Sequence, residues 1–462
     1  MTSRTQRLEA LPVTSKHRKL LFGAGIGWAL DAMDVGLISF VMAALSLHMG
    51  FDKTQLSWLA TAGFIGMALG ATLGGLLADR IGRKQVFALT LLVYGVATGA
   101  SALVAGLGLL ILLRFIVGLG LGAELPVAST LMAEFAPRAV RGRMIVLLEA
   151  FWALGWILAA VIGTFVVANG ENGWRWGLAL GMVPAIYSLV IRRKMPESVA
   201  FLETKGRHEE AEQIVASFEA AAAENAKSSP QQPVVPLAKK AARETVWSRS
   251  ESADSENAAA SENLLLASAS SIWSQALRRR TIALWIIWFC INLSYYGAFI
   301  WIPTLLVQSG FDLVKSFSFT LIITLAQLPG YATAAWLIEK IGRRCTLALF
   351  LIGSAIGAGC YAAANTEMLI IAAGCVLSFF NLGAWGALYA IGPDLYPTQL
   401  RGRGTGAAAG FGRVASILAP LLVPVVLQIG GIAGLFVLFA AAFILAAVAA
   451  WVLPEQRGVR LS

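Results

Sequence analysis

Charged residues are scarce in this chain of 462 residues. Asp, Glu, Lys and Arg together make up 13% of the sequence, whereas hydrophobic residues make up 58%. Soluble globular domains usually carry about 25% charged residues. The shortage of charge therefore excludes an ordinary soluble protein and predicts a chain that lies mostly in a membrane.

Cysteine is rare, and the usual catalytic motifs are missing. The sequence has no zinc-ligand spacing, nucleophile elbow or phosphate-binding loop, so it disfavours a membrane enzyme and predicts neither a metal nor a cofactor. Residues 1–19 are polar and precede an apolar run as long as a helix, so no cleavable signal peptide is expected. The four cysteines lie in or at the ends of apolar runs without metal spacing, and we interpret them as buried small hydrophobic residues: Cys290, Cys345, Cys360 and Cys375.

Long apolar runs are abundant. A helix needs about 20 apolar residues to cross the hydrocarbon core of a bilayer. Such runs predict twelve transmembrane helices in two sets of six: 20–46, 55–78, 86–106, 108–133, 144–168, 174–191, 281–307, 317–338, 345–362, 368–391, 404–428 and 432–453. The predicted fold class is an all-α membrane protein with two six-helix bundles, at 20–191 and 281–453.

A hydrophilic linker, 192–280, joins the two predicted bundles. Residues 199–223 have helical periodicity and are expected on the cytoplasmic surface. Residues 224–263 contain few large apolar groups, so they cannot bury enough surface to offset the entropy of ordering and are expected to be disordered. Polar tails at 1–19 and 454–462 complete the predicted organisation.

Basic residues are distributed unevenly about the predicted helices. With the N-terminus placed inside, only Lys53, Arg175 and Lys315 fall in outside loops, and Arg114 and Arg413 fall within helices. Every other Lys and Arg lies inside, as the positive-inside rule requires. The basic excess therefore predicts two cytoplasmic termini and a lipid bilayer as partner, and it requires no nucleic acid.

Two short motifs recur 260 residues apart. PRAVRGR at 137–143 is similar to PTQLRGR at 397–403, and DRIGRK at 79–84 is similar to EKIGRR at 339–344. Two independent motifs with one offset indicate two halves built on one plan. A duplicated helical bundle is a common design of alternating-access transporters.

The string GGLLADRIGRK and its partner EKIGRR resemble the signature loop of the major facilitator superfamily. This resemblance implies a twelve-helix fold, solute transport and a role for the loop as a conformational latch; simple anchoring of basic residues on the inner side is the alternative. Gly74, Gly75 and Gly82 are expected to permit close helix approach and a tight turn. The candidate gate residues are Asp79, Arg80, Gly82, Arg83, Glu339, Gly342, Arg343, Arg141 and Arg401.

Several charges fall inside predicted helices, where each costs at least about 2.5–3.5 kcal/mol at the bilayer centre. Asp31 and Asp34 share one face of the first helix and should repel each other, which favours proton binding by one of them. A fixed ion pair, for instance with Arg114, is the alternative. Glu124 and Glu149 are each interpreted as a proton site or an ion-pair partner. The candidate proton-coupling residues are Asp31, Asp34, Glu124, Glu149 and Arg114.

A second group of candidates suits a ligand. Arg413 lies among small residues and either binds an anionic substrate or balances an acid of the first half. Aromatic and amide side chains gather on four predicted helices and suit a planar ring with a few polar atoms, although helix packing also explains such residues. The candidate substrate-binding residues are Trp28, Trp152, Trp156, Asn292, Tyr295, Tyr296, Asn381, Trp385, Tyr389 and Arg413.

Longer strings narrow the resemblance. PES at 196–198 and PEQ at 454–456 resemble the sugar-porter and metabolite–proton symporter branches. GWALDAMDVGLISFVMAAL at 27–45, NLSYYGAFIWIPTLLVQSGF at 292–311 and NLGAWGALYAIGPDLYPTQLRG at 381–402 resemble the bacterial niacin permeases. The resemblance implies a bacterial inner-membrane protein, expected as a monomer, that takes up nicotinate with protons. Nicotinate is a flat ring with one carboxylate, which suits an aromatic cage with one Arg.

Two other functions stay open at this point. A sugar or another organic acid is the alternative substrate for a proton symporter. A transporter-like receptor without flux is the alternative from a different class, suggested by a weaker resemblance to the synaptic vesicle glycoprotein 2 family. Short outside loops disfavour the receptor, and so does the position of the glycosylation-type triplet 292–294 within a predicted helix.

Overall fold

The structure is a computed structural model that describes residues 3–104, 106–137, 140–228 and 271–454. In these ranges, every regular element is helical, and ten stretches are long and apolar enough to cross a membrane. The last stretch contains two membrane helices, because α18 (Thr398–Val452) is interrupted at Gly431, where φ is 61°. With the less apolar α4 (Arg83–Ser101), the described part of the chain has the twelve helices that the sequence predicts.

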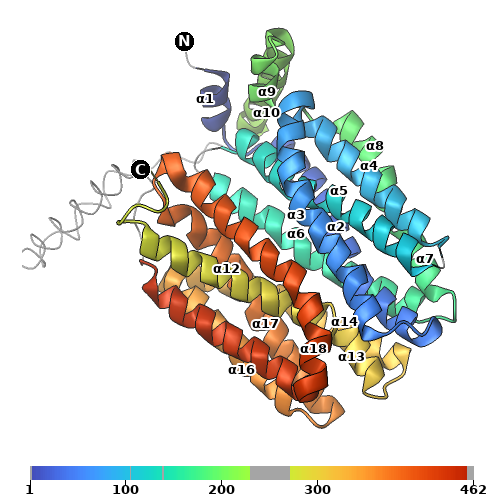
Figure 1. The fold of residues 1–462 in the computed structure, drawn as a ribbon. Coiled ribbons are helices and arrows are strands. Elements are labelled where there is room, and N and C mark those ends of the chain that lie inside the picture. Colours follow the sequence, from blue (N-terminus) through green and yellow to red (C-terminus); the bar gives the residue numbers. More distant parts are fainter. Residues whose placement is uncertain (1–2, 105, 138–139, 229–270, 455–462) are drawn as a thin grey trace, which may run out of the picture.

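The helices form two groups that follow each other along the chain (Figure 1). The first group contains α2 (Ser15–His48), α3 (Lys53–Ile81), α4, α5 (Leu107–Phe135), α6 (Arg141–Ile162) with the π-helix η1 (Gly163–Val167), and α7 (Gly173–Leu180) with α8 (Val183–Lys194). The second contains α12 (Arg278–Phe299) with α13 (Ile302–Gln308), α14 (Leu313–Leu325) with α15 (Gln327–Ile341), α16 (Arg343–Ala363), α17 (Glu367–Ile391) with the 3-10 turn η3 (Gly392–Leu395), and α18. Below, these groups are called the first and second halves.

Three predicted spans are each divided between two consecutive α-helices. Proline accounts for two of the breaks, since Pro184 lies in the first turn of α8 and Pro303 in the first turn of α13. Proline fits a first turn, where its missing N–H has no partner to lose, and is unfavourable inside a helix. Hydrophobicity alone does not reveal such a break.

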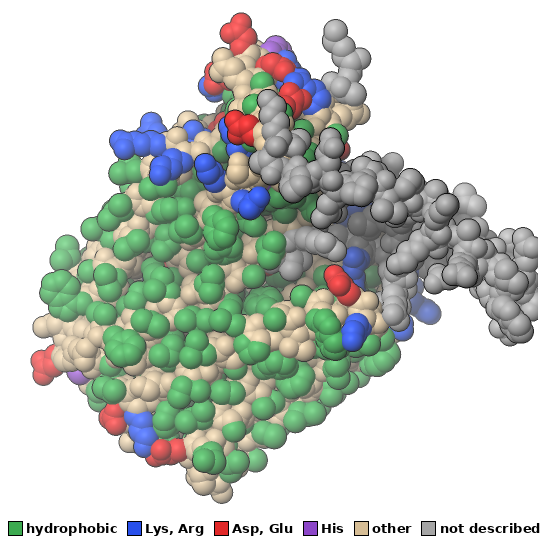
Figure 2. Space-filling model, turned by 180° about the vertical axis from the view of Figure 1, so that it is seen from behind, with side chains coloured by type: hydrophobic (Ala, Val, Ile, Leu, Met, Phe, Trp, Pro, Cys, Tyr) green, Lys and Arg blue, Asp and Glu red, His purple; other side chains and the backbone are tan. Residues whose placement is uncertain are grey.

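An apolar belt surrounds the molecule. Figure 2 shows hydrophobic side chains over the lateral face, with Lys, Arg, Asp and Glu gathered towards the two ends. Large apolar side chains such as Trp176 and Phe165 are 68% and 63% exposed. Such exposure is favourable where the surrounding medium is lipid, and helices satisfy their backbone hydrogen bonds internally there.

The 260-residue offset extends to the backbone. Gly82 and Gly342 separate α3 from α4 and α15 from α16, with φ values of 103° and 91°. Gly50 and Gly310, also 260 residues apart, have φ values of 66° and 94°. Only glycine adopts such values without steric cost, so the two halves repeat the same turns.

Close packing joins α3 to α5. A Cβ atom at Gly122 would lie 2.0 Å from the carbonyl oxygen of Met67, and one at Gly118 would lie 2.1 Å from that of Gly63. Gly74 also packs closely, because its Cβ would lie 2.3 Å from that of Ala123. The prediction of close approach is wrong for Gly75, which has no atom within 4 Å of such a Cβ.

Replacing Gly122 with alanine is therefore expected to destabilise the protein by about 1–3 kcal/mol, because the new methyl group overlaps backbone that cannot move freely. Thermal unfolding in detergent measures the effect. Gly75→Ala is the matched control and should unfold at or above the wild-type temperature, since alanine favours a helix over glycine. An equal loss in both variants would contradict this account of the α3–α5 contact.

Three further helices cover one end of the first half: α1 (Arg4–Glu9), α9 (Val199–Thr204) and α10 (His208–Ser228). The predicted helix 199–223 is interrupted at Gly206, where φ is 72°. It also extends to Ser228, so the expectation of disorder from residue 224 is wrong for 224–228, and residues 229–263 lie outside the described ranges. The sequence did not predict α1 within the polar tail.

Ion pairs attach α1 to α10. Arg7 binds Glu212 at 2.6 Å and Glu219 at 2.7 Å, and Arg4 binds Glu212 at 2.8 Å. Hydrogen bonds from Arg7 hold the pKa of both carboxyl groups below the ordinary value. These pairs are therefore present above the ordinary carboxylate pKa and are lost as the pH falls through the lowered pKa of the folded protein.

The two halves contact each other at the end remote from α10. The Ser57 hydroxyl donates to the carbonyl oxygen of Pro420 at 2.5 Å, near the start of α3. The rings of Phe40 and Phe317 meet edge to face with centroids 5.0 Å apart. These contacts close that end of the boundary between the halves.

Candidate solute-binding site

Aromatic rings line the middle of the boundary between the halves. From the first half, Trp28 lies on α2 and Trp152 on α6, with ring centroids 4.9 Å apart. The Trp152 indole N–H donates to the Tyr295 hydroxyl of α12 at 3.2 Å, across the boundary. Trp156 stands 5.6 Å from the Tyr295 ring, and Tyr296 meets Phe64 of α3 at 4.7 Å.

The rings continue into the second half. Trp385 of α17 lies 5.9 Å from Tyr295 and 5.8 Å from Tyr389. Trp288 of α12 joins them, 5.5 Å from Trp385 and 5.3 Å from Tyr389. The structure therefore brings every predicted aromatic ligand residue into one network of rings that spans both halves.

The two predicted amides have different surroundings. Asn292 donates to the Trp288 carbonyl oxygen at 2.7 Å and accepts from the Ser416 hydroxyl at 2.9 Å, so it holds α12 against α18. Asn381 of α17 is fully buried, and neither atom of its amide has a hydrogen-bond partner. An unpartnered buried amide is costly, which makes Asn381 the better candidate to bind a solute.

Arg413 of α18 lies beside this ring network. Its guanidinium neighbours the Tyr296 hydroxyl and is close enough to Glu149 of α6 for their charges to interact. Glu149 is 7% exposed and also neighbours the Trp28 indole. The two predicted partners of Arg413 are an anionic ligand and an acid of the first half. Both would therefore reach Arg413 in the same region of the boundary.

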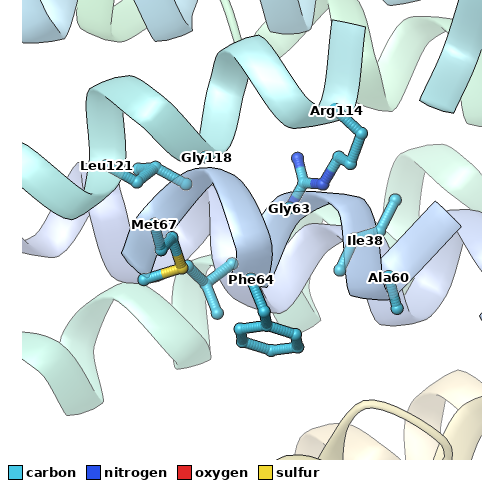
Figure 3. Close-up of a pocket in the computed structure, with 9 residues that line it drawn as sticks. Ile38, Ala60, Gly63, Phe64, Met67, Arg114, Gly118 and Leu121 are labelled. Atoms are coloured by element: carbon cyan, nitrogen blue, oxygen red, sulfur yellow. The ribbon is translucent and has the colours of Figure 1, made fainter. Parts of the chain in front are cut away.

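Asp34 has fixed partners. Arg114 of α5 binds its carboxylate at 2.7 Å and its backbone oxygen at 3.2 Å, and the Thr98 hydroxyl of α4 donates to it at 2.6 Å. The small cavity beside Arg114 has a volume of about 10 Å³ (Figure 3). This space holds about one water molecule and no solute.

Asp31 has different neighbours, although it lies three residues from Asp34. Asp31 is 1% exposed, and its carboxyl group adjoins Glu124 of α5 and Tyr94 of α4. None of the polar side-chain atoms of these three residues has a hydrogen-bond partner of good geometry. A Cβ at Gly27 would lie 2.9 Å from Glu124 Oε1, so this glycine makes room for the second acid.

The gate candidates lie far along the helices from the ring network. Arg83 binds Asp79 at 3.1 Å and Glu134 of α5 at 3.7 Å, and its guanidinium lies over the Phe201 ring of α9. A hollow of about 360 Å³ opens there, lined by Asp79, Arg83, Ala200, Phe201, Thr204 and Lys205. Arg80 is exposed.

The other gate candidates lie at the same end of the molecule. Arg141 binds Glu9 of α1 at 2.6 Å, so it attaches α6 to the terminal helix. Glu339 is exposed, Arg343 and Arg401 are half-buried, and Gly342 forms the turn already described.

Four residues near these groups were not among the candidates predicted from the sequence. Trp288 precedes Asn292 by four residues and Tyr295 by seven, so helical spacing alone would have placed it on their face. Tyr331 of α15 lies close to Glu149 and Tyr296, but nothing in its spacing indicates this position. Tyr94 neighbours Asp31, and Thr98 binds Asp34. Both contacts depend on the packing of α4 against α2, so the sequence does not indicate them.

A duplicated bundle of membrane helices with a polar and aromatic centre between its halves is the design of a membrane transporter. The chain matches the sugar (and other) transporter family over residues 18–462, and it belongs to that family. It is therefore a multi-pass membrane transporter of a small molecule and not an enzyme.

The sequences of curated relatives are similar to this chain over most of their length. The niacin transporter NiaP of Acinetobacter baylyi is 44% identical over 417 residues, which are 90% of this chain and 89% of the relative. The putative niacin/nicotinamide transporter NiaP of Bacillus subtilis is 42% identical over 88% of each chain. The synaptic vesicle 2-related protein of Bos taurus is 29% identical over 98% of this chain and 80% of its own.

Solved structures share the fold. The xylose transporter XylE of E. coli, in a partially occluded inward-open conformation, superposes with a TM-score of 0.75 and 17% identity, covering 97% of this chain and all of that one. The same symporter bound to 6-bromo-6-deoxy-D-glucose has a TM-score of 0.69. The predicted major facilitator fold is thus confirmed.

Proposed function

We propose that this transporter imports nicotinate, or a closely similar small aromatic carboxylate, across the bacterial inner membrane together with protons. The observation that carries the proposal is Arg413, a cation placed beside a network of aromatic rings at the boundary of the halves. Rings stack on a flat solute, and a guanidinium holds a carboxylate through two parallel hydrogen bonds. The names of the relatives from Acinetobacter baylyi and Bacillus subtilis support the same substrate.

The proposal includes a division of roles. Trp28, Trp152, Tyr295, Trp385 and Tyr389 surround the ring of the solute, while Arg413 binds its carboxylate. The bundles 20–191 and 281–453 move against each other as a monomer, with both termini in the cytoplasm. In this orientation, the contacts near Phe40 and Ser57 close the outer end of the boundary, and the loops with Arg83 and Arg343 act as latches at the inner end.

Uptake of labelled nicotinate into proteoliposomes tests the proposal. An imposed pH gradient, acidic outside, should drive about tenfold accumulation per pH unit if one proton accompanies one anion, since one unit corresponds to about 1.4 kcal/mol. A membrane potential alone should then drive nothing, whereas each net charge moved would contribute roughly 2.3 kcal/mol per 100 mV. Unlabelled nicotinate and benzoate should compete, and xylose should not.

Three results would contradict nicotinate import or support a different function. Absence of uptake under either gradient contradicts nicotinate import. Competition by xylose and not by benzoate indicates a sugar symporter. Tight nicotinate binding without exchange of labelled for unlabelled solute indicates a receptor.

A further inference from the structure

Five basic side chains gather at one end of the first half, where α2 begins and α8 ends. Two of them lie near the start of α2, and three consecutive cations lie in the last turn of α8. All five are exposed, and within the described ranges none of them takes part in an ion pair or a side-chain hydrogen bond. This group, called the basic rim below, consists of Arg18, Lys19, Arg192, Arg193 and Lys194.

The helices that carry the basic rim touch each other at Gly23. The Tyr187 hydroxyl of α8 donates to the Gly23 carbonyl oxygen at 2.9 Å, and a Cβ at Gly23 would lie 3.6 Å from the sulfur of Met195. Met195 directly follows the last cation of α8, and Lys19 precedes Gly23 by about one helical turn. Both parts of the basic rim therefore lie within about one turn of the same contact.

An apolar strip extends from the basic rim along α2. Phe22 and Ile26 are exposed, although α2 is covered on both sides of them. On one side Gly23 meets α8, and on the other a Cβ at Gly25 would lie 2.6 Å from the ring of Phe151 of α6. Figure 2 shows the same succession, with Lys and Arg side chains at the border of the apolar belt at the end from which α10 projects.

The acids nearest to the basic rim along the chain have other partners. Glu197 accepts the backbone N–H of Lys84 at 3.1 Å, at the start of α4, and Glu9 binds Arg141 at 2.6 Å. The helix dipole favours cations at the end of α8 but disfavours them near the start of α2. The positive-inside rule places cations on one side of the membrane and does not require five of them at one helix contact. Mutual repulsion within the basic rim therefore favours an anion from outside the chain.

We propose that the basic rim and the apolar strip together bind an anionic phospholipid. Its phosphate lies among the cations, and one acyl chain lies along Phe22 and Ile26. A lipid with two phosphates matches the two groups of cations on α2 and α8, and cardiolipin has this chemistry. Such a lipid holds α2 against α8 in the first half. The inference does not depend on which solute is transported.

Native mass spectrometry of the purified full chain in detergent, titrated with cardiolipin, tests the inference. Wild-type protein should bind one cardiolipin in preference to phosphatidylcholine, which has no net charge. Arg192→Gln combined with Arg193→Gln should weaken this binding about 25-fold, since each cation near anionic lipid contributes about fivefold. Cardiolipin should also raise the unfolding temperature of wild-type protein more than that of the variant, because a ligand of the folded state stabilises it.

The matched control is Arg278→Gln combined with Arg279→Gln, which removes two exposed cations at the start of α12 in the second half. This variant should bind cardiolipin as wild type does. Inorganic phosphate at equal ionic strength should not displace the lipid, because it has no acyl chain for the apolar strip. An equal loss of binding in both variants overturns the inference and indicates general attraction to basic surface. Displacement by phosphate, or equal binding of phosphatidylcholine, overturns it as well.

Discussion

Nicotinate binding should weaken by roughly 30-fold to 5,000-fold when Arg413 is replaced by glutamine. The variant loses the cation that is proposed to hold the solute carboxylate, and removing one partner of a buried charge pair costs about 2–5 kcal/mol. Uptake should fall below detection at micromolar nicotinate. Equilibrium binding to the protein in detergent measures the loss directly, independently of any effect on transport rate.

Two comparisons sharpen this result. Arg413→Lys keeps the charge but loses the planar fork, so it should bind with intermediate affinity. Arg279→Gln removes an exposed arginine near the start of α12 and should bind as wild type. If Arg413→Gln binds nicotinate normally and is folded, the carboxylate is recognised elsewhere and the assignment of Arg413 is wrong.

Replacing Asp34 with alanine is expected to destabilise the protein by about 3–5 kcal/mol, because it leaves the buried guanidinium of Arg114 without its carboxylate. The Thr98 hydroxyl loses its acceptor in the same variant. Thermal unfolding of the purified protein in detergent measures the change. Removing the second charge as well, in Asp34→Asn with Arg114→Gln, should recover much of the stability.

An exposed ion pair provides the matched control. Arg207 and Glu210 meet at 2.5 Å on the surface, with about half of each side chain accessible. Glu210→Ala should therefore cost less than about 1 kcal/mol. If Asp34→Ala unfolds at the wild-type temperature, Arg114 has another way to satisfy its charge, and the pair is not the fixed link that its geometry indicates.

The positions and orientation of the membrane helices could be predicted from the sequence, because local features of the sequence determine them. Apolar runs, the bias of basic residues and the motifs at 79–84 and 339–344 each depend on neighbouring residues. The equivalent turns at Gly82 and Gly342 confirm what the repeated motifs predicted. Breaks within helices were harder to predict, since Pro184 and Pro303 begin new helices without interrupting the apolar run.

The partners of the buried charges did not follow from sequence in the same way. Asp31 and Asp34 share a helical face, and their spacing suggested that they act as a pair. In the folded protein, Asp34 meets Arg114 while Asp31 meets Glu124. Both partners lie on α5. Which acid of α2 each of them meets depends on how α2 and α5 are aligned, and this alignment depends on the packing of Gly27 and its neighbours.

The sequence by itself determined that this protein is a duplicated twelve-helix membrane transporter, and it supplied the candidate residues of a central site. Only the tertiary structure decided which of them meet: Asp34 with Arg114, Trp152 with Tyr295, and Asn292 with Ser416. The physical reason is that hydropathy and helical spacing act within one helix. Contacts between helices depend instead on the register in which distant segments pack, and no short stretch of sequence encodes that register.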